Sequence, residues 1–119
     1  MRLIFTTKAS TFEKINIPIS NLVVGKKYKL YFSQDNDATI TESNNYGCTI
    51  LNTQTTQTTS VIPSLLWSPT TQTAIKKSIN QTITFIATAK TMYWTWDFSK
   101  LADGTESNFK IYDIYLAKI

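Results

Sequence analysis

Short runs of β-forming residues recur along the chain, separated by polar turn clusters at intervals of roughly eight to twelve residues. In the clearest run, residues 26–33, Tyr28, Leu30 and Phe32 alternate with lysines and Tyr31. Successive side chains of a strand point to opposite faces, so this alternation predicts a half-buried strand. We expect further strands over residues 2–7, 12–19, 46–51, 81–88, 91–99 and 109–119, with a short one over 38–41. The spacing predicts an all-β, antiparallel sandwich or barrel.

The last run changes the parity of its apolar residues. Phe109 and Ile111 share one face of a strand, whereas Ile114 and Leu116 have the opposite parity. All four can face a core only if one extra residue is inserted between the two pairs. A β-bulge near Tyr112-Asp113 does this, and we predict one there.

The length of 119 residues fits one domain, residues 1–119, and no internal repeat is evident. Aromatic residues make up 13% of the chain, which gives it the apolar area that disordered chains lack. The apolar run at residues 3–5 is too short for a signal peptide, and no segment is long enough to span a membrane. We therefore expect a protein made in the cytoplasm of its host and not inserted into a membrane.

The residue types needed for catalysis are scarce. The chain has no histidine, which excludes Ser-His-Asp and Cys-His catalysis and His-ligated metals. Three glycines make no phosphate-binding loop, and most carboxylates fall in polar segments. The lone Cys48 is expected to be a buried apolar residue. The sequence predicts a non-enzymatic protein without a cofactor.

Two motifs suggest a family. Residues 21–32 have the form N-L-x-x-G-K-x-Y-x-L-x-F, and residues 109–116 have the form F-x-I-x-D-I-x-L. With the strand runs at 82–85 and 91–98 between them, this order resembles the jelly-roll β-sandwiches of carbohydrate-binding-module and galactose-binding-like type. Such sandwiches also occur in phage virion proteins and adhesins. The resemblance implies an antiparallel jelly roll and sugar binding through exposed aromatic rings.

The chain departs from this family at its last motif. Many members have two adjacent acids before the final apolar pair and a structural calcium nearby, whereas this chain has Tyr112 and then Asp113. Calcium takes six to eight oxygen ligands. We therefore predict no metal, with Asp113 as a weak candidate ligand.

Aromatic side chains are the remaining candidates for a binding site. Trp94 and Trp96 share a face with Met92 and Phe98, which predicts that they belong to the core. Tyr31, Tyr46 and Tyr93 are expected to point away from the core or to lie in loops, and Trp67 fits either place. We take these four as candidate ligand-binding residues.

Three functions remain open. The first is a phage virion accessory protein (a capsid decoration, head-fibre or tail component) that contacts other virion proteins or itself in a homo-oligomer. Thr/Asn/Gln-rich loops and an Ile/Asn/Lys/Thr bias typical of AT-rich phage genes favour it. The alternative is a carbohydrate-binding module. The third is a weak polyanion binder that uses the lysines near residue 27, although the thin spread of the basic residues argues against nucleic acid.

Overall fold

The computed structural model describes residues 2–8, 14–36, 46–54, 65–68, 77–98 and 106–119. In these ranges the chain forms strands and no helix, so none of them holds an apolar helix that could span a bilayer. The strands are β1 (Arg2–Lys8), β2 (Lys14–Ile19), β3 (Lys27–Asn36), β4 (Gly47–Leu51), β5 (Lys77–Ile86), β6 (Met92–Asp97) and β7 (Glu106–Lys118). The prediction of an all-β chain is confirmed for this part of the sequence.

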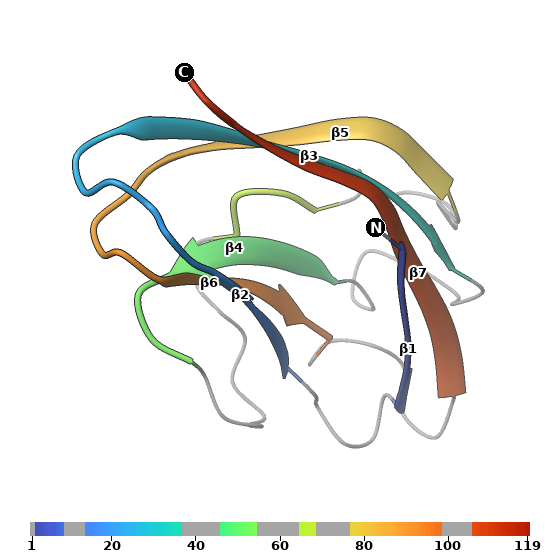
Figure 1. Cartoon of the computed structure of the whole chain (residues 1–119). Coiled ribbons are helices and arrows are strands. Elements are labelled where there is room, and N and C mark those ends of the chain that lie inside the picture. The colour runs from blue at the N-terminus through green and yellow to red at the C-terminus, as the bar shows by residue number, and fades with distance from the viewer. Residues whose placement is uncertain (1, 9–13, 37–45, 55–64, 69–76, 99–105) are drawn as a thin grey trace.

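The strands form two antiparallel sheets that lie over one another (Figure 1). One sheet has the order β1-β7-β3-β5 and the other the order β2-β6-β4. Consecutive strands lie in alternate sheets, so each connection carries the chain from one layer to the other. Each sheet therefore has one face toward the other sheet and one face away from it.

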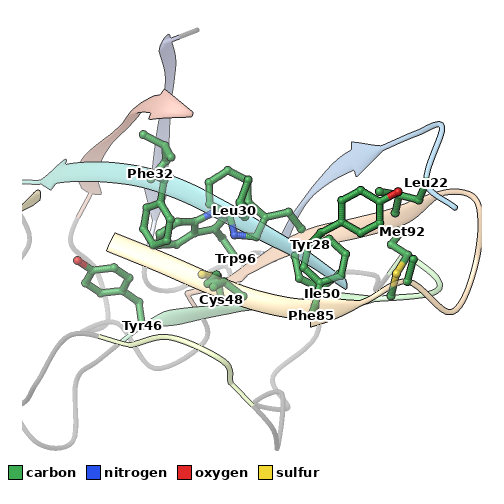
Figure 2. Packing of buried hydrophobic residues seen from close by; sticks show 14 of the residues in the cluster. Leu22, Tyr28, Leu30, Phe32, Tyr46, Cys48, Ile50, Phe85, Met92 and Trp96 are labelled. Carbon is green, nitrogen blue, oxygen red and sulfur yellow. The ribbon is translucent and has the colours of Figure 1, made fainter. Parts of the chain in front are cut away.

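The core between the sheets is rich in aromatic rings. Trp94 and Trp96 are 1% and 0% exposed, which confirms their predicted place in the core. The ring of Phe32 meets the rings of Trp94, Trp96 and Trp67 edge-on, at centroid distances of 5.3, 5.6 and 5.2 Å. Figure 2 shows Phe32 and Trp96 close together above Cys48. Edge-to-face contacts of this kind stabilise aromatic clusters beyond the area they bury.

Three strands extend beyond the ranges that the sequence predicts for them. β3 continues through Asn36, β5 begins at Lys77 and β7 begins at Glu106. Gln34, at a predicted turn, is instead fully buried, and its Nε2 donates a hydrogen bond to Ser78 Oγ at 3.0 Å. A buried polar residue with a partner fits a strand, and sequence alone does not reveal that partner. The short strand predicted over residues 38–41 lies outside the described residues.

The predicted β-bulge in β7 is confirmed. Tyr31 pairs with Tyr115 and Ser33 pairs with Tyr112, so Asp113 and Ile114 together oppose the single residue between. Asp113 has φ 53°, a left-handed conformation that Asp adopts more readily than most residues. The extra residue lets Ile114 and Leu116 pack against the same core as Phe109 and Ile111.

A second bulge, not predicted, lies on the other side of β3. Phe32 pairs with Gln81 and Gln34 with Ser78, so two residues of β5 oppose one residue of β3. One of the two, Asn80, has φ 58°, and its N–H donates to Ser33 Oγ at 3.1 Å. Both strands that flank β3 therefore bulge opposite adjacent residues of β3, namely Phe32 for β7 and Ser33 for β5. Such bulges bend and twist a sheet locally.

A short segment, residues 65–68, continues the smaller sheet past β4. Trp67 forms an isolated antiparallel bridge with Cys48, whose N–H donates to Trp67 O at 2.9 Å. Gly47 makes this approach possible, because a Cβ there would lie 2.6 Å from Trp67 O. Residues 65–68 thus lie at the edge of the smaller sheet, next to β4.

Candidate functional site

The outward side of β7, β3 and β5 forms a solvent-facing surface on one side of the two bulges. Tyr28, Leu30 and Phe32 of β3 are buried, so the residues between them face away from the core. The strand register places their neighbours in three rows across the sheet. The rows are Tyr115–Tyr31–Thr82, Ala117–Lys29–Thr84 and Ile119–Lys27–Ile86, and we call these residues the tyrosine–lysine face.

Two tyrosines form the first row of this face. The rings of Tyr31 and Tyr115 lie 5.8 Å apart between centroids and are tilted by 41°. Tyr115 is 64% exposed, and Tyr31 is half-buried beside it. Aromatic rings on neighbouring strands stabilise a sheet modestly, but so much exposed ring surface also provides a contact area for a partner.

A positive charge lies against the tyrosine pair. Lys29 Nζ is 5.7 Å from the centroid of the Tyr31 ring, within the range of a cation–π contact. Lys27 follows in the next row, flanked by Ile119 and Ile86, which are 67% and 54% exposed. None of the residues of the tyrosine–lysine face is an Asp or a Glu. It therefore offers aromatic and aliphatic surface, hydroxyl groups and positive charge to a ligand.

The sequence predicts that Tyr46 points away from the core or lies in a loop, but the structure places its side chain in the core. Its side chain is 2% exposed and packs against Phe109 at 4.9 Å and Phe98 at 5.9 Å between ring centroids. Tyr46 directly precedes β4, and its ring fills the end of the core that β7 closes. The residues that Tyr46 packs against are distant in sequence, so the polar residues next to it in the chain do not reveal that it is buried.

Trp67 and Tyr93 lie apart from the tyrosine–lysine face. Trp67 is half-buried, and its indole N–H donates to Gln81 Oε1 at 2.9 Å, so it closes the edge of the core. Tyr93 is half-buried in β6, where it pairs with Pro18 and Leu51 in the other sheet. The structure thus does not bring together the four candidates named from sequence, and of these only Tyr31 lies on the face.

Tyr115 is the residue of this face that sequence reasoning missed. A signal for it was present, because the bulge that turns Ile114 and Leu116 inward also turns Tyr115 outward. The position of Tyr115 beside Tyr31 could not be predicted from the sequence, because it depends on the pairing of β7 with β3.

The outward side of the smaller sheet is polar but buried. Lys14 Nζ lies 3.8 Å from Asp97 Oδ1, and both side chains are 2% exposed. In the next row, Thr95 Oγ1 donates to Asn16 Oδ1 at 2.8 Å. A buried ion pair with hydrogen-bonded neighbours of this kind fits a structural role in joining β2 to β6.

Groups that could hold a metal or act as a nucleophile are few in the described ranges. There, no three His, Cys, Asp or Glu side chains come together. Asp113, the weak candidate, is exposed in the β7 bulge. Cys48 is fully buried, as predicted, and burial raises the pKa of its thiol far above the ordinary value of 9.0, with a smaller opposing effect from Trp94. A thiol held neutral in this way is a poor nucleophile.

No protein-family model matches the chain, and no curated protein and no solved structure is significantly similar to it.

Proposed function

We propose that this chain is a non-enzymatic interaction module that contacts its partner through the tyrosine–lysine face. The observation that carries the proposal is the exposed Tyr31–Tyr115 pair, with Lys29 against it. Tyrosine is enriched in protein interfaces because one end of its ring is apolar and the other polar. The missing histidine and the inaccessible Cys48 support a role without catalysis.

The proposed architecture is an antiparallel jelly roll. In support, consecutive strands alternate between the sheets, and the orders β1-β7-β3-β5 and β2-β6-β4 place the last two strands inside their sheets. The bridge of residues 65–68 to β4 would supply a reduced eighth strand at the edge of the smaller sheet. Eight strands in two such sheets make up a jelly roll.

The proposed setting is a bacteriophage virion, with this chain as a capsid decoration, head-fibre or tail component. Its partners there would be other virion proteins or further copies of itself. The support comes from the sequence, namely the polar Thr/Asn/Gln-rich segments and the Ile/Asn/Lys/Thr bias.

Mass spectrometry of purified particles tests the setting, and incorporation of variants tests the face. We expect the chain in the particles, and we expect Tyr31→Ser/Tyr115→Ser to lower its incorporation at least tenfold. Tyr93→Ser, on the opposite sheet, is the matched control and should be incorporated normally. Particles without the chain would overturn the virion setting. Normal incorporation of the double variant would overturn the role of the face in assembly.

Glycan recognition is the second candidate function, and the same tyrosine pair favours it. An open aromatic ring offers a flat apolar surface to the C–H face of a sugar, while Thr82 and Lys29 in adjoining positions offer hydrogen-bond donors. A glycan array tests this candidate. Binding by the wild type and by Tyr93→Ser, together with loss in Tyr115→Ser, is the expected result; an array without signal would reject it.

A further inference from the structure

The larger sheet ends on one side at β5, and the outer edge of this strand is open among the described strands. In the order β1-β7-β3-β5, the one described strand that pairs with β5 is β3. The N–H of Ala87, directly after β5, donates to Lys26 O, so alternate residues counted back from Ala87 point their backbone groups toward β3. The residues between them point their N–H and C=O groups out of the sheet edge, and these are Thr82, Thr84 and Ile86.

The other edges of the two sheets carry features that hinder the addition of a further strand. β1 contains two charged residues, β2 contains Pro18, which has no N–H to donate, and β4 pairs with residues 65–68. By contrast, residues 78–86 of β5 include no charged residue, no Pro and no Gly. The bulge of β5 lies before residue 81, so residues 81–86 form a regular edge. This edge is the one that can accept another strand.

A second copy of β5 fits this edge. It is already a strand, so its docking orders no flexible chain, unlike the docking of a disordered peptide. In an antiparallel pairing about a two-fold axis at Thr84, Thr84 lies opposite Thr84 of the other copy and Thr82 lies opposite Ile86. All three outward-pointing residues of each copy are then hydrogen-bonded. On the inner side, Ile83 lies opposite Phe85, a β-branched and aromatic pair that stabilises neighbouring strands.

The lysines of the tyrosine–lysine face stay apart in this arrangement. Lys29 pairs with Thr84 inside each copy, so the two Lys29 residues are three strand spacings apart, about 14 Å. That separation exceeds the distance of about 8–10 Å over which exposed charges interact at physiological salt. Lys27 lies beside Ile86, which faces Thr82 of the other copy, so the two Lys27 residues are farther apart still. Repulsion between copies is therefore weak.

We propose that the chain forms a two-fold dimer through antiparallel pairing of two β5 edges, which joins their larger sheets into one continuous sheet. Each copy uses its β5 edge once, so the assembly closes at two copies. The contact surface is small because it consists mainly of one strand, and the dissociation constant is therefore expected in the micromolar range. The inference goes beyond the proposed role of the tyrosine–lysine face, since the pairing leaves Tyr31 and Tyr115 open.

Sedimentation velocity of the full chain tests the dimer. We expect the mass to rise from 13.5 kDa toward twice that value as the protein concentration increases from roughly 1 to 300 μM. Tyr31→Ser/Tyr115→Ser should leave this increase unchanged, because the tyrosine pair takes no part in it. The two proposals can therefore fail separately.

Charges placed at the two-fold axis test the site. Thr84→Lys and Thr84→Glu should each weaken the dimer at least tenfold, because each places like charges directly opposite one another. An equimolar mixture of the two variants should dimerise again, since opposite charges then meet. Thr82→Lys is the matched control: its added charge faces Ile86, so it should weaken the dimer less than threefold. Thermal unfolding of each variant confirms that it folds.

A cysteine at the axis tests the register. Cys48 is buried and is the one cysteine of the chain, so an added surface cysteine reports on its own neighbours. The Cα atoms of the two Thr84 residues should lie about 5.5 Å apart, a separation that a disulfide spans. Thr84→Cys treated with diamide should give a disulfide-linked dimer. Thr82→Cys should stay unlinked under the same conditions, because its two copies are about 13 Å apart.

Three results would overturn the inference. A mass of one chain at every concentration would reject the dimer. A mass that grows beyond two copies would show open-ended association instead of a closed pair. A dimer that survives Thr84→Lys, or that is lost in Tyr31→Ser/Tyr115→Ser, would assign the contact to another surface.

Discussion

At the residue scale, burial keeps the thiol of Cys48 neutral and therefore unreactive. Its backbone lies between β6 and residues 65–68, with Trp96 and Trp67 as its strand neighbours, and its side chain is fully buried. In this apolar setting the charged thiolate is disfavoured, which raises the pKa of the thiol. The side chain therefore acts as a small apolar residue and contributes to the dependence of stability on pH.

We predict that Cys48 makes the folded state less stable at alkaline pH. Above the ordinary pKa of 9.0 the unfolded thiol loses its proton while the folded thiol keeps it. The unfolded state then binds fewer protons, so the free energy of unfolding falls by about 1.4 kcal/mol per pH unit. The measurement is urea unfolding of wild type and Cys48→Ala from neutral pH to above pH 9. All other side chains are the same in the two proteins, so the difference isolates Cys48; parallel pH profiles would contradict the prediction.

At the scale of elements, the two bulges give the larger sheet its shape. They lie at the same level on the two neighbours of β3, and each contains a left-handed residue, Asp113 in β7 and Asn80 in β5. Because of the β7 bulge, apolar residues at odd positions before it and at even positions after it all face the core, while Tyr115 faces outward. The tyrosine–lysine face therefore depends on one inserted residue.

Asp113 should tolerate only residues that accept a left-handed backbone. We expect Asp113→Gly to keep or raise the stability, and Asp113→Val to lower it by roughly 1–2 kcal/mol because its Cβ clashes in that conformation. Thr84→Val, at an exposed position of β5 without positive φ, is the control and should change stability by less than about 0.5 kcal/mol. Chemical denaturation measures all three, and an unaffected Asp113→Val would argue against the bulge.

Removing one partner of the ion pair between β2 and β6 should lower stability strongly, whereas replacing both partners with apolar residues should lower it much less. Asp97→Asn removes the carboxylate that lies 3.8 Å from the buried amine of Lys14 and should cost about 3–5 kcal/mol. The apolar double variant Lys14→Met/Asp97→Leu should recover most of that loss, because neither charge is then desolvated. Unfolding midpoints of the two variants test this. A double variant as unstable as Asp97→Asn would mean that hydrogen bonds to the neighbouring polar groups dominate.

At the scale of the whole molecule, the two sheets divide the aromatic residues into a packed group and an open one. Tyr46 lies in the core with Phe98 and Phe109, whereas Tyr115 lies on the tyrosine–lysine face. Packing in the core thus explains the position of Tyr46, but it does not explain the exposed ring of Tyr115. This contrast is the physical basis for assigning a binding role to the face.

Truncation of the two tyrosines should therefore have opposite effects on stability and binding. Tyr46→Ala removes a buried ring and should cost about 3–5 kcal/mol. Tyr115→Ala should change the free energy of unfolding by less than about 0.5 kcal/mol. Denaturation curves of the two variants, recorded side by side, give the comparison. A large loss of stability in Tyr115→Ala would assign that ring to structure instead.

The sequence by itself determined the strand class, most strand positions, the inward face of β3 and the parity change in β7, because these follow from local alternation. It also determined that Trp94, Trp96 and Cys48 are buried. Only the tertiary structure decided the sheet order, the bulge in β5, the extension of β3 through Gln34 and the burial of Tyr46. These depend on partners far away in the chain. The Tyr31–Tyr115 pair combines both kinds of information: alternation turned each ring outward, and the pairing of β3 with β7 brought the two rings together.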